Sequence, residues 1–174
     1  MVLSKNMQKL VAGSSTIRKL FEEGIELAKE VGAENVYDFS LGNPAAPVPE
    51  EVKKSIYDIL ENRNANFVHC YMPNAGYPEV REKVAANLNK KYDSSFTKED
   101  IIMTVGAAGG INCVLRCLLE QEDEVLCFAP FFGEYNSYVM NFGGNLKVVP
   151  ADYETFQLNV EEADKYITER TKAV

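Results

Sequence analysis

Residues 101–149 read IIMTVGAAGGINCVLRCLLEQEDEVLCFAPFFGEYNSYVMNFGGNLKVV. Three apolar runs in this stretch are typical of buried strands: 101–105, 124–128 and 145–149. Two amphipathic stretches between these runs predict helices: 107–120 and 132–142. Alternating strands and helices with short connections are typical of a parallel sheet covered by helices. The sequence therefore predicts an α/β fold with a parallel βαβαβ unit.

The rest of the chain predicts further helices and short extended segments. Apolar spacing indicates a helix over 14–31, with Ser14 or Ser15 as its N-cap and Gly32 as its end. Other elements are expected as follows: a strand at 36–41, a proline-rich turn at 42–49, helices at 49–62 and 77–91, a capped turn at 97–100, a helix at 159–168 begun by Asn159 with Glu162 as capping-box partner, and the entry to a strand at 171–174.

Composition indicates an ordinary globular protein. Of 174 residues, 46% are hydrophobic and 25% charged, which argues against disorder. The 18 basic and 26 acidic residues give a net charge of −8, which argues against a generic nucleic-acid or anionic-membrane surface. No apolar run is long enough to span a bilayer, and residues 1–8 lack a signal sequence. We expect a soluble, cytoplasmic protein.

The cysteines and the single histidine do not form a metal-binding pattern. Cys70, Cys113, Cys117 and Cys127 include no CxxC pair, and His69 stands beside Cys70 without a second ligand nearby. We therefore expect no metal site. Cys113 and Cys117 alternate with leucines on a predicted helix, so buried, reduced thiols are the expected state. His69 as a catalytic base has no neighbouring partner to support it.

The segment Thr104–Ile111 joins a predicted strand to a helix through small residues. Unpaired amides at a helix N-terminus attract anions, and small side chains let an anion approach closely. No acidic residue lies between Met103 and Leu119, although the net charge is −8. These features suit a phosphate group. The alternative is that glycine and alanine here only permit tight packing between strand and helix.

Two common phosphate motifs are absent from this segment. The chain has no GxxxxGK[ST] sequence, so it is not a P-loop nucleoside triphosphatase (NTPase). Residues 106–110 do not fit GxGxxG, and the only acidic residue of the following strand, Glu124, opens that strand rather than ending it. A dinucleotide site is therefore poorly supported.

An aromatic pair follows the next predicted strand. In an open α/β sheet, ligands bind beyond the carboxyl ends of the strands, which brings Phe131 or Phe132 to the same edge as the 104–111 segment. A ring there could stack on a flat heteroaromatic group whose phosphate binds at the amides. Packing in the core is the more ordinary role of a phenylalanine.

Four segments together resemble the pyridoxal-phosphate-dependent aminotransferases of fold type I, the class I/II or aspartate aminotransferase-like group. They are LGNP at 41–44, YMPNAGYPEVR at 71–81, TVGAA at 104–108, and the stretch from Asp123 through Pro130-Phe131-Phe132 to Gly144. Their order and spacing are those of the first half of that family. The resemblance covers nearly the whole chain.

The resemblance implies pyridoxal 5'-phosphate as cofactor and roles for six residues. Gly106, Ala107 and Ala108 match the loop that holds the cofactor phosphate, and Phe132 matches the aromatic residue that stacks on the pyridine ring. Gly42 matches the position where the main chain lies against the substrate carboxylate. Tyr71 matches a tyrosine that reaches the cofactor phosphate of the neighbouring subunit, which implies a homodimer with shared active sites.

The resemblance also implies a domain division. Residues 1–48 would form an N-terminal arm and the start of a small domain. Residues 49–174 would form the first part of the cofactor-binding large domain, which is truncated here.

In this family, the lysine that forms the Schiff base lies beyond position 174, and none of the thirteen lysines here matches its context. We therefore assign no catalytic residue to this chain. It resembles the N-terminal portion of an enzyme that transfers an amino group between an amino acid and a 2-oxo acid, and the chain alone is expected to be inactive. The alternatives are a carbon–sulfur lyase or decarboxylase on the same scaffold, or a non-catalytic truncated binding module. The residues leave the amino donor and acceptor open.

Overall fold

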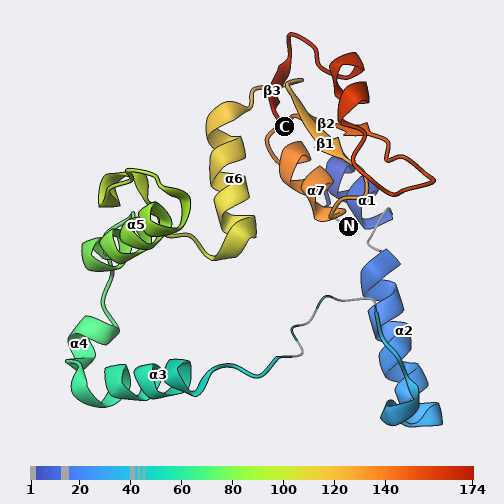
Figure 1. The fold of residues 1–174 in the computed structure, drawn as a ribbon. Coiled ribbons are helices and arrows are strands. Elements are labelled where there is room, and N and C mark those ends of the chain that lie inside the picture. The colour runs from blue at the N-terminus through green and yellow to red at the C-terminus, as the bar shows by residue number, and fades with distance from the viewer. Residues whose placement is uncertain (1–2, 13–15, 40–41, 43, 45) are drawn as a thin grey trace. The chain divides into compact units, whose positions relative to one another are not determined.

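The computed structural model describes the chain except for residues 1–2, 13–15, 40–41, 43 and 45 (Figure 1). The chain divides into two compact units, Met1–His69 and Cys70–Val174. The first contains only helices as regular structure among its described residues, and the second contains the sheet.

The first unit contains short and medium helices. They are α1 (Lys5–Ala12), α2 (Thr16–Val31), the 3-10 helix η1 (Ala33–Asn35), α3 (Glu50–Asn62) and α4 (Ala65–Val68). The predicted end of α2 is confirmed, because Gly32 has φ 88°, a conformation that favours glycine. The predicted α3 is confirmed within one residue, with Glu50 and Glu51 in its first turn. The suggested N-caps Ser14 and Ser15 lie outside the described residues.

The predicted strand at 36–41 is wrong over its described part. Residues 36–39 have no regular structure, and residues 40–41 lie outside the described part of the chain. A strand needs a hydrogen-bonded partner, and among the described residues no strand pairs with this segment.

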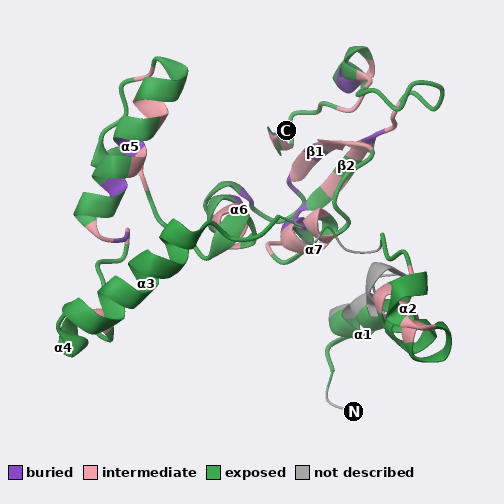
Figure 2. Ribbon diagram, turned by 60° about the horizontal axis from the view of Figure 1, so that its bottom comes forward, coloured by how far each residue is buried: buried purple, intermediate pink, exposed green. Residues whose placement is uncertain are grey.

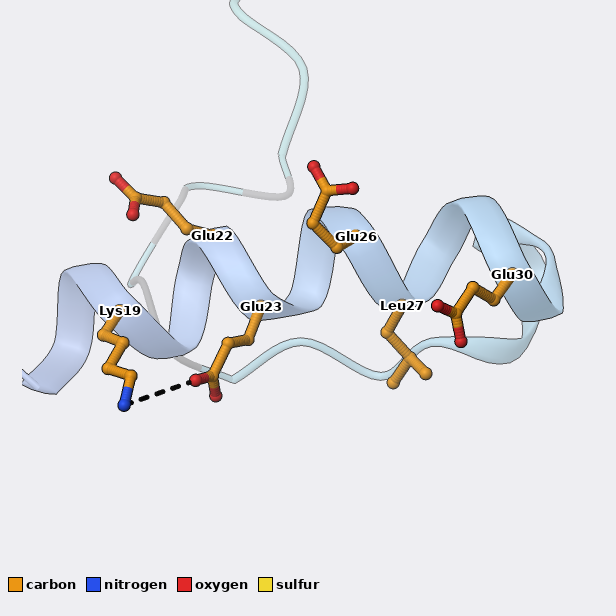
Figure 3. A pocket seen from close by; sticks show the side chains of 6 residues that line it. All are labelled: Lys19, Glu22, Glu23, Glu26, Leu27 and Glu30. Carbon is orange, nitrogen blue, oxygen red and sulfur yellow. Dashed lines mark ion pairs between the residues drawn. The ribbon is translucent and has the colours of Figure 1, made fainter.

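Helix α2 has a solvated acidic surface (Figure 3). The surface is lined by Lys19, Glu22, Glu23, Glu26, Leu27 and Glu30. Lys19 pairs with Glu23 at 3.7 Å one turn away, and both side chains are mostly exposed. Exposed pairs of this kind add little stability, so the surface is an ordinary polar helix face.

The second unit contains a three-stranded parallel sheet and the helices around it. Its elements are α5 (Pro78–Tyr92), the 3-10 helix η2 (Lys98–Asp100), α6 (Gly106–Leu118), β1 (Glu124–Phe128), α7 (Glu134–Met140), β2 (Asn145–Val149), the 3-10 helix η3 (Val160–Lys165) and β3 (Thr171–Ala173). The strand order is β2-β1-β3. Residues Glu124 to Phe128 pair with Asn145 to Val149 in unbroken register. This confirms the predicted α/β class and, of the predicted parallel βαβαβ unit, the part formed by β1, α7 and β2.

Two predicted elements of this unit are corrected. Residues 101–104 form no strand; instead the Met103 amide donates to the Ala75 carbonyl at 3.0 Å. No second strand lies beside this segment among the described residues, so a ladder cannot form. The helix predicted at 159–168 is only the six-residue η3, and Asn159 makes no side-chain cap. The capped turn at 97–100 is confirmed, since Thr97 and Asp100 form a capping box.

The core of the second unit consists of two small clusters (Figure 2). Leu115 and Leu119 pack with Val139 of α7 on one side, and Leu126 and Val149 pack with Ala163 on the other. Leu126, Val139 and Val149 are the most buried side chains, at 2%, 1% and 0% exposure. The sheet is therefore covered on both faces near β1.

The prediction of buried thiols at Cys113 and Cys117 is wrong, because both are exposed. Each lies two residues from the buried Leu115, and two residues along an α-helix is a rotation of about 200°, which points to the opposite side. Val114 and Leu118 are also exposed, at 55% and 45%. The described residues thus cover only part of the apolar surface of α6.

Among the described residues, no helix is long and apolar enough to cross a membrane.

Candidate functional site

The start of α6 is an open helix end with no acidic side chain. Gly106 has φ 68°, and a Cβ added there would meet no atom within 4 Å. The preceding residue, Val105, is 95% exposed and makes no side-chain cap. Ala107 and Ala108 follow in the first turn and are exposed. The backbone of Ala107 and Ala108 therefore lies at an exposed helix end, where the helix dipole favours an anion.

Thr104 fixes this helix end from within. Its hydroxyl donates to the Gly106 carbonyl at 3.0 Å, and the Gly106 amide donates to the Thr104 carbonyl at 3.0 Å. A Cβ on Gly110 would lie 3.2 Å from the Thr104 hydroxyl. Of the two interpretations of this segment, tight packing applies to Gly110. Residues 106–108 remain exposed, as phosphate binding would require.

Phe132 lies between β1 and α7 with a half-exposed ring. Its exposed fraction is 52%, and that of Phe131 is 36%. The Phe132 ring packs edge-to-face on Tyr135, with centroids 5.8 Å apart and an interplanar angle of 84°. This contact supports the ring from one side only, which leaves surface free for stacking.

A cavity of about 330 Å³ lies between α6, β1 and α7. Ile111 of α6, one turn beyond Ala107, lines this cavity together with Phe128 at the end of β1 and Tyr135 of α7. Tyr135 is the same residue that contacts the Phe132 ring. Neither Gly106–Ala108 nor Phe132 lines the cavity itself, so the two are related only through Ile111 and Tyr135.

Tyr71 is fully exposed in the loop before α5. A tyrosine ring with no packing partner is available for contact with another molecule. Tyr77 closes the same loop, and partial burial, together with the neighbouring Cys70 thiol, raises the pKa of its phenol.

The remaining candidate residues are Gly42, His69 and the cysteines. Gly42 is exposed in the first unit, and a Cβ there would meet no atom within 4 Å, so its main chain is accessible. The backbone amide of His69 donates to the Ala65 carbonyl at 3.0 Å and closes α4, which is a structural role. Cys113, Cys117 and Cys127 are free thiols.

Arg81 is the feature that sequence reasoning missed. The 71–81 motif contains this arginine without indicating a role for it, yet Arg81 is 9% exposed and donates to three backbone carbonyls. Its partners are up to 20 residues away in sequence, so no local pattern could reveal them. The available signal was an arginine within a helix that follows a glycine-containing loop.

The sequence of the chain matches one established family. The family model for aminotransferase class I and II matches residues 33–174. The chain therefore belongs to the aminotransferase class I and II family, as the motifs predicted.

Individual relatives agree with this assignment. The chain is 34% identical to an aspartate aminotransferase of Pyrococcus abyssi over 92% of its length, and 34% identical to aromatic-amino-acid aminotransferase 2 of Thermococcus litoralis over its whole length. An amino transferase of Eubacterium rectale has a similar structure, with a TM-score of 0.90 and 37% identity over 98% of this chain.

The chain is shorter than these relatives. It covers 39% of the Pyrococcus abyssi protein, 42% of the Thermococcus litoralis protein and 43% of the Eubacterium rectale chain. It corresponds to the N-terminal part of such aminotransferases. The relatives also differ in the amino acids in their names, among them aspartate, aromatic amino acids and N-acetyl-LL-diaminopimelate.

Proposed function

We propose that this chain supplies the phosphate-binding and ring-stacking parts of a pyridoxal 5'-phosphate site in an aminotransferase. The observation that carries the proposal is the exposed, acid-free helix end at Gly106–Ala108, together with the half-exposed Phe132 ring that follows β1. The complete protein would transfer an amino group between an amino acid and a 2-oxo acid. The names of the relatives support this reaction class.

The residues present fit this cofactor in two respects. A dianionic phosphate suits amides that no side chain caps, and the absence of a Cβ on Gly106 keeps the approach open. A planar pyridine ring suits the free surface of Phe132. When bound, pyridoxal phosphate supplies an electron sink for the carbon that carries the amino group.

In this proposal the chain's own residues bind and orient rather than react. The amides of Ala107 and Ala108 hold the phosphate, the Phe132 ring fixes the plane of the pyridine, and the Gly42 main chain lies against the substrate carboxylate. No lysine of this chain is given a role in proton transfer. We also propose the domain division at residues 48 and 49, with 1–48 as arm and start of the small domain and 49–174 as the first part of the cofactor domain.

The proposal includes a homodimer and a cytoplasmic location. The fully exposed Tyr71 supports a contact across a subunit interface, since its ring has no packing partner within its own unit. The free thiols of Cys113, Cys117 and Cys127 suit a reducing compartment.

A single introduced tryptophan tests the cofactor site. The chain has no tryptophan, so Phe132→Trp creates one fluorophore at the proposed stacking position. We expect pyridoxal 5'-phosphate to quench its emission at lower concentration than pyridoxal does. Adding Ala108→Asp should weaken pyridoxal 5'-phosphate binding about tenfold, because a carboxylate then competes with phosphate at the helix end.

The matched control is Cys113→Asp, which adds the same charge to an exposed position of the same helix, more than a turn from the amide loop. This variant should keep the affinity of the parent. Equal quenching by pyridoxal and pyridoxal 5'-phosphate, with no effect of Ala108→Asp, would contradict the proposal.

A further inference from the structure

Arg81 forms a buried clamp on backbone carbonyls. Its Nε donates to the Gly76 carbonyl at 3.2 Å, and one terminal nitrogen donates to the carbonyls of Lys98 at 2.7 Å and Ile101 at 3.4 Å. The side chain is 11% exposed, whereas its carboxylate neighbour Glu99, at 3.9 Å, is 72% exposed. An ion pair with so exposed a partner contributes little, so the carbonyls are the main partners of this charge.

The three carbonyls belong to segments that lead into the proposed site. Gly76 ends the loop that begins at Tyr71, and Ile101 lies three residues before Thr104, which fixes the helix end at Gly106. These two segments also contact one another directly, because the Met103 amide donates to the Ala75 carbonyl at 3.0 Å.

Gly76 allows this contact to be close. It has φ 95°, and a Cβ there would lie 2.6 Å from Cγ of Met103. The backbone of Gly76 therefore packs against the side chain of Met103. The Arg81 guanidinium forms hydrogen bonds to both segments.

A lysine at position 81 could not form all of these hydrogen bonds. The guanidinium presents donors in a fixed planar fork, so one side chain reaches several carbonyls at once, whereas an ammonium is a point charge. Burying a charged group costs free energy. This cost is offset only when the N–H donors of the group form hydrogen bonds. The fork geometry, rather than the charge alone, is what this position requires.

We propose that Arg81 is a positioning residue for cofactor binding: it holds the Tyr71 loop and the 101–108 segment in one fixed register. The proposal rests on the proposed function, since it assigns Arg81 a role toward the same phosphate site. Arg81 does not contact the cofactor. It acts through the backbone that carries Gly106 and Tyr71.

The test compares Arg81→Lys, Arg81→Met and the control Lys83→Met, which removes a charge from an exposed position of the same helix. Amide hydrogen exchange is measured by mass spectrometry on the intact 174-residue chain. We expect Arg81→Met to speed exchange about tenfold in peptides covering 73–77 and 101–108, as the loss of hydrogen bonds to a charged group implies, and to leave β1 and β2 unchanged.

The second readout is the affinity ratio of pyridoxal 5'-phosphate to pyridoxal, measured in the Phe132→Trp background. Arg81→Met should lower this ratio about tenfold, Arg81→Lys should lower it less, and Lys83→Met should not change it. Loss of overall stability would lower both affinities together and leave the ratio unchanged.

The outcomes separate the two proposals. If the parent chain binds pyridoxal 5'-phosphate selectively and Arg81→Met leaves the ratio and the exchange of 101–108 unchanged, the positioning role is overturned and the proposed function stands. If the parent shows no selectivity for the phosphate, the proposed function is overturned, and the role of Arg81 toward the cofactor with it.

Discussion

Gly106 and Gly133 show how one residue type serves two different backbone conformations. A Cβ added at either position would meet no atom within 4 Å. Gly106 nevertheless has φ 68°, in the left-handed region, whereas Gly133 has φ −55° in the ordinary helical region. The need for glycine at position 106 is therefore a matter of backbone conformation and of open approach to the amides, and not of packing.

Substitution by alanine separates these effects. We expect Gly106→Ala to lower the free energy of unfolding by about 1 kcal/mol, the cost of placing an L-residue in the left-handed region. Gly133→Ala, the matched control, should change stability by less than about 0.5 kcal/mol. Urea denaturation of the two variants measures the difference, and equal stabilities would show that the backbone at 106 can relax.

At the scale of single residues, the sequence predicts local backbone features better than it predicts side-chain burial and long-range contacts. The small, acid-free segment 104–111 was identified correctly as a helix start, because composition alone defines it. The burial of Cys113 and Cys117 was predicted wrongly, since it depends on what covers the other side of α6. The Arg81 clamp was missed because its partners are separated from it along the chain.

Elements that have partners were predicted well. Strands β1 and β2 have the predicted bounds, and their pairing gives each a defined start and end. The segment 101–105 has an equally apolar sequence but no paired neighbour among the described residues. An apolar run thus predicts where a strand can form, and only pairing decides whether it does.

The start of β1 contains a pH-dependent link between elements. The Thr168 hydroxyl donates to one oxygen of Glu124 at 2.7 Å, and Lys147 of β2 lies 3.3 Å from the other. The hydrogen bond from Thr168 is the main cause that holds the pKa of Glu124 below its ordinary value of 4.5; Lys147 adds to the lowering, and partial burial opposes it. The ionised form of Glu124 is therefore favoured by folding.

The sign of the pH effect follows from this direction. A lowered carboxyl pKa stabilises the fold above pH 4.5, and the contribution disappears as the pH falls through the lowered pKa. We expect Thr168→Val to destabilise the chain at pH 7 and to have progressively less effect as the pH is lowered below 4.5. Urea midpoints across this pH range measure the difference.

The control places Thr168→Val in the Glu124→Gln background. There the effect of the threonine substitution should be the same at every pH, because the titrating partner is gone. If the effect of Thr168→Val on the urea midpoint is independent of pH in the parent background too, Thr168 acts through packing and not through Glu124.

At the scale of the whole molecule, the family could be predicted from sequence because four motifs in fixed order identify it. The family match over 33–174 confirms that assignment. The site itself is only partly accessible to such reasoning, since Tyr71 is proposed to act in a second subunit and Gly42 lies in the other compact unit. The motifs at 41–44 and 71–81 indicate Gly42 and Tyr71, but no pattern within one chain gives the distances between residues that meet only in an assembly.

Mixed dimers test the proposed sharing of sites. We expect Tyr71→Ala and Gly106→Asp to bind pyridoxal 5'-phosphate poorly when each is expressed alone. Coexpressed, they should recover about a quarter of the wild-type sites, because random pairing gives one intact site in each mixed dimer. Each variant coexpressed with a differently tagged copy of itself is the control. No recovery in the mixed sample would show that Tyr71 serves its own subunit.

The order β2-β1-β3 also has a kinetic consequence. Glu124 pairs with Asn145, 21 residues later, and with Thr171, 47 residues later. Closing the longer loop costs about 0.7 kcal/mol more chain entropy. The β1–β3 pairing is also irregular and short, so its hydrogen bonds offset less of this entropy cost. We therefore expect β1, α7 and β2 to assemble first as a folding nucleus, and β3 to be added afterwards to an edge that already exists.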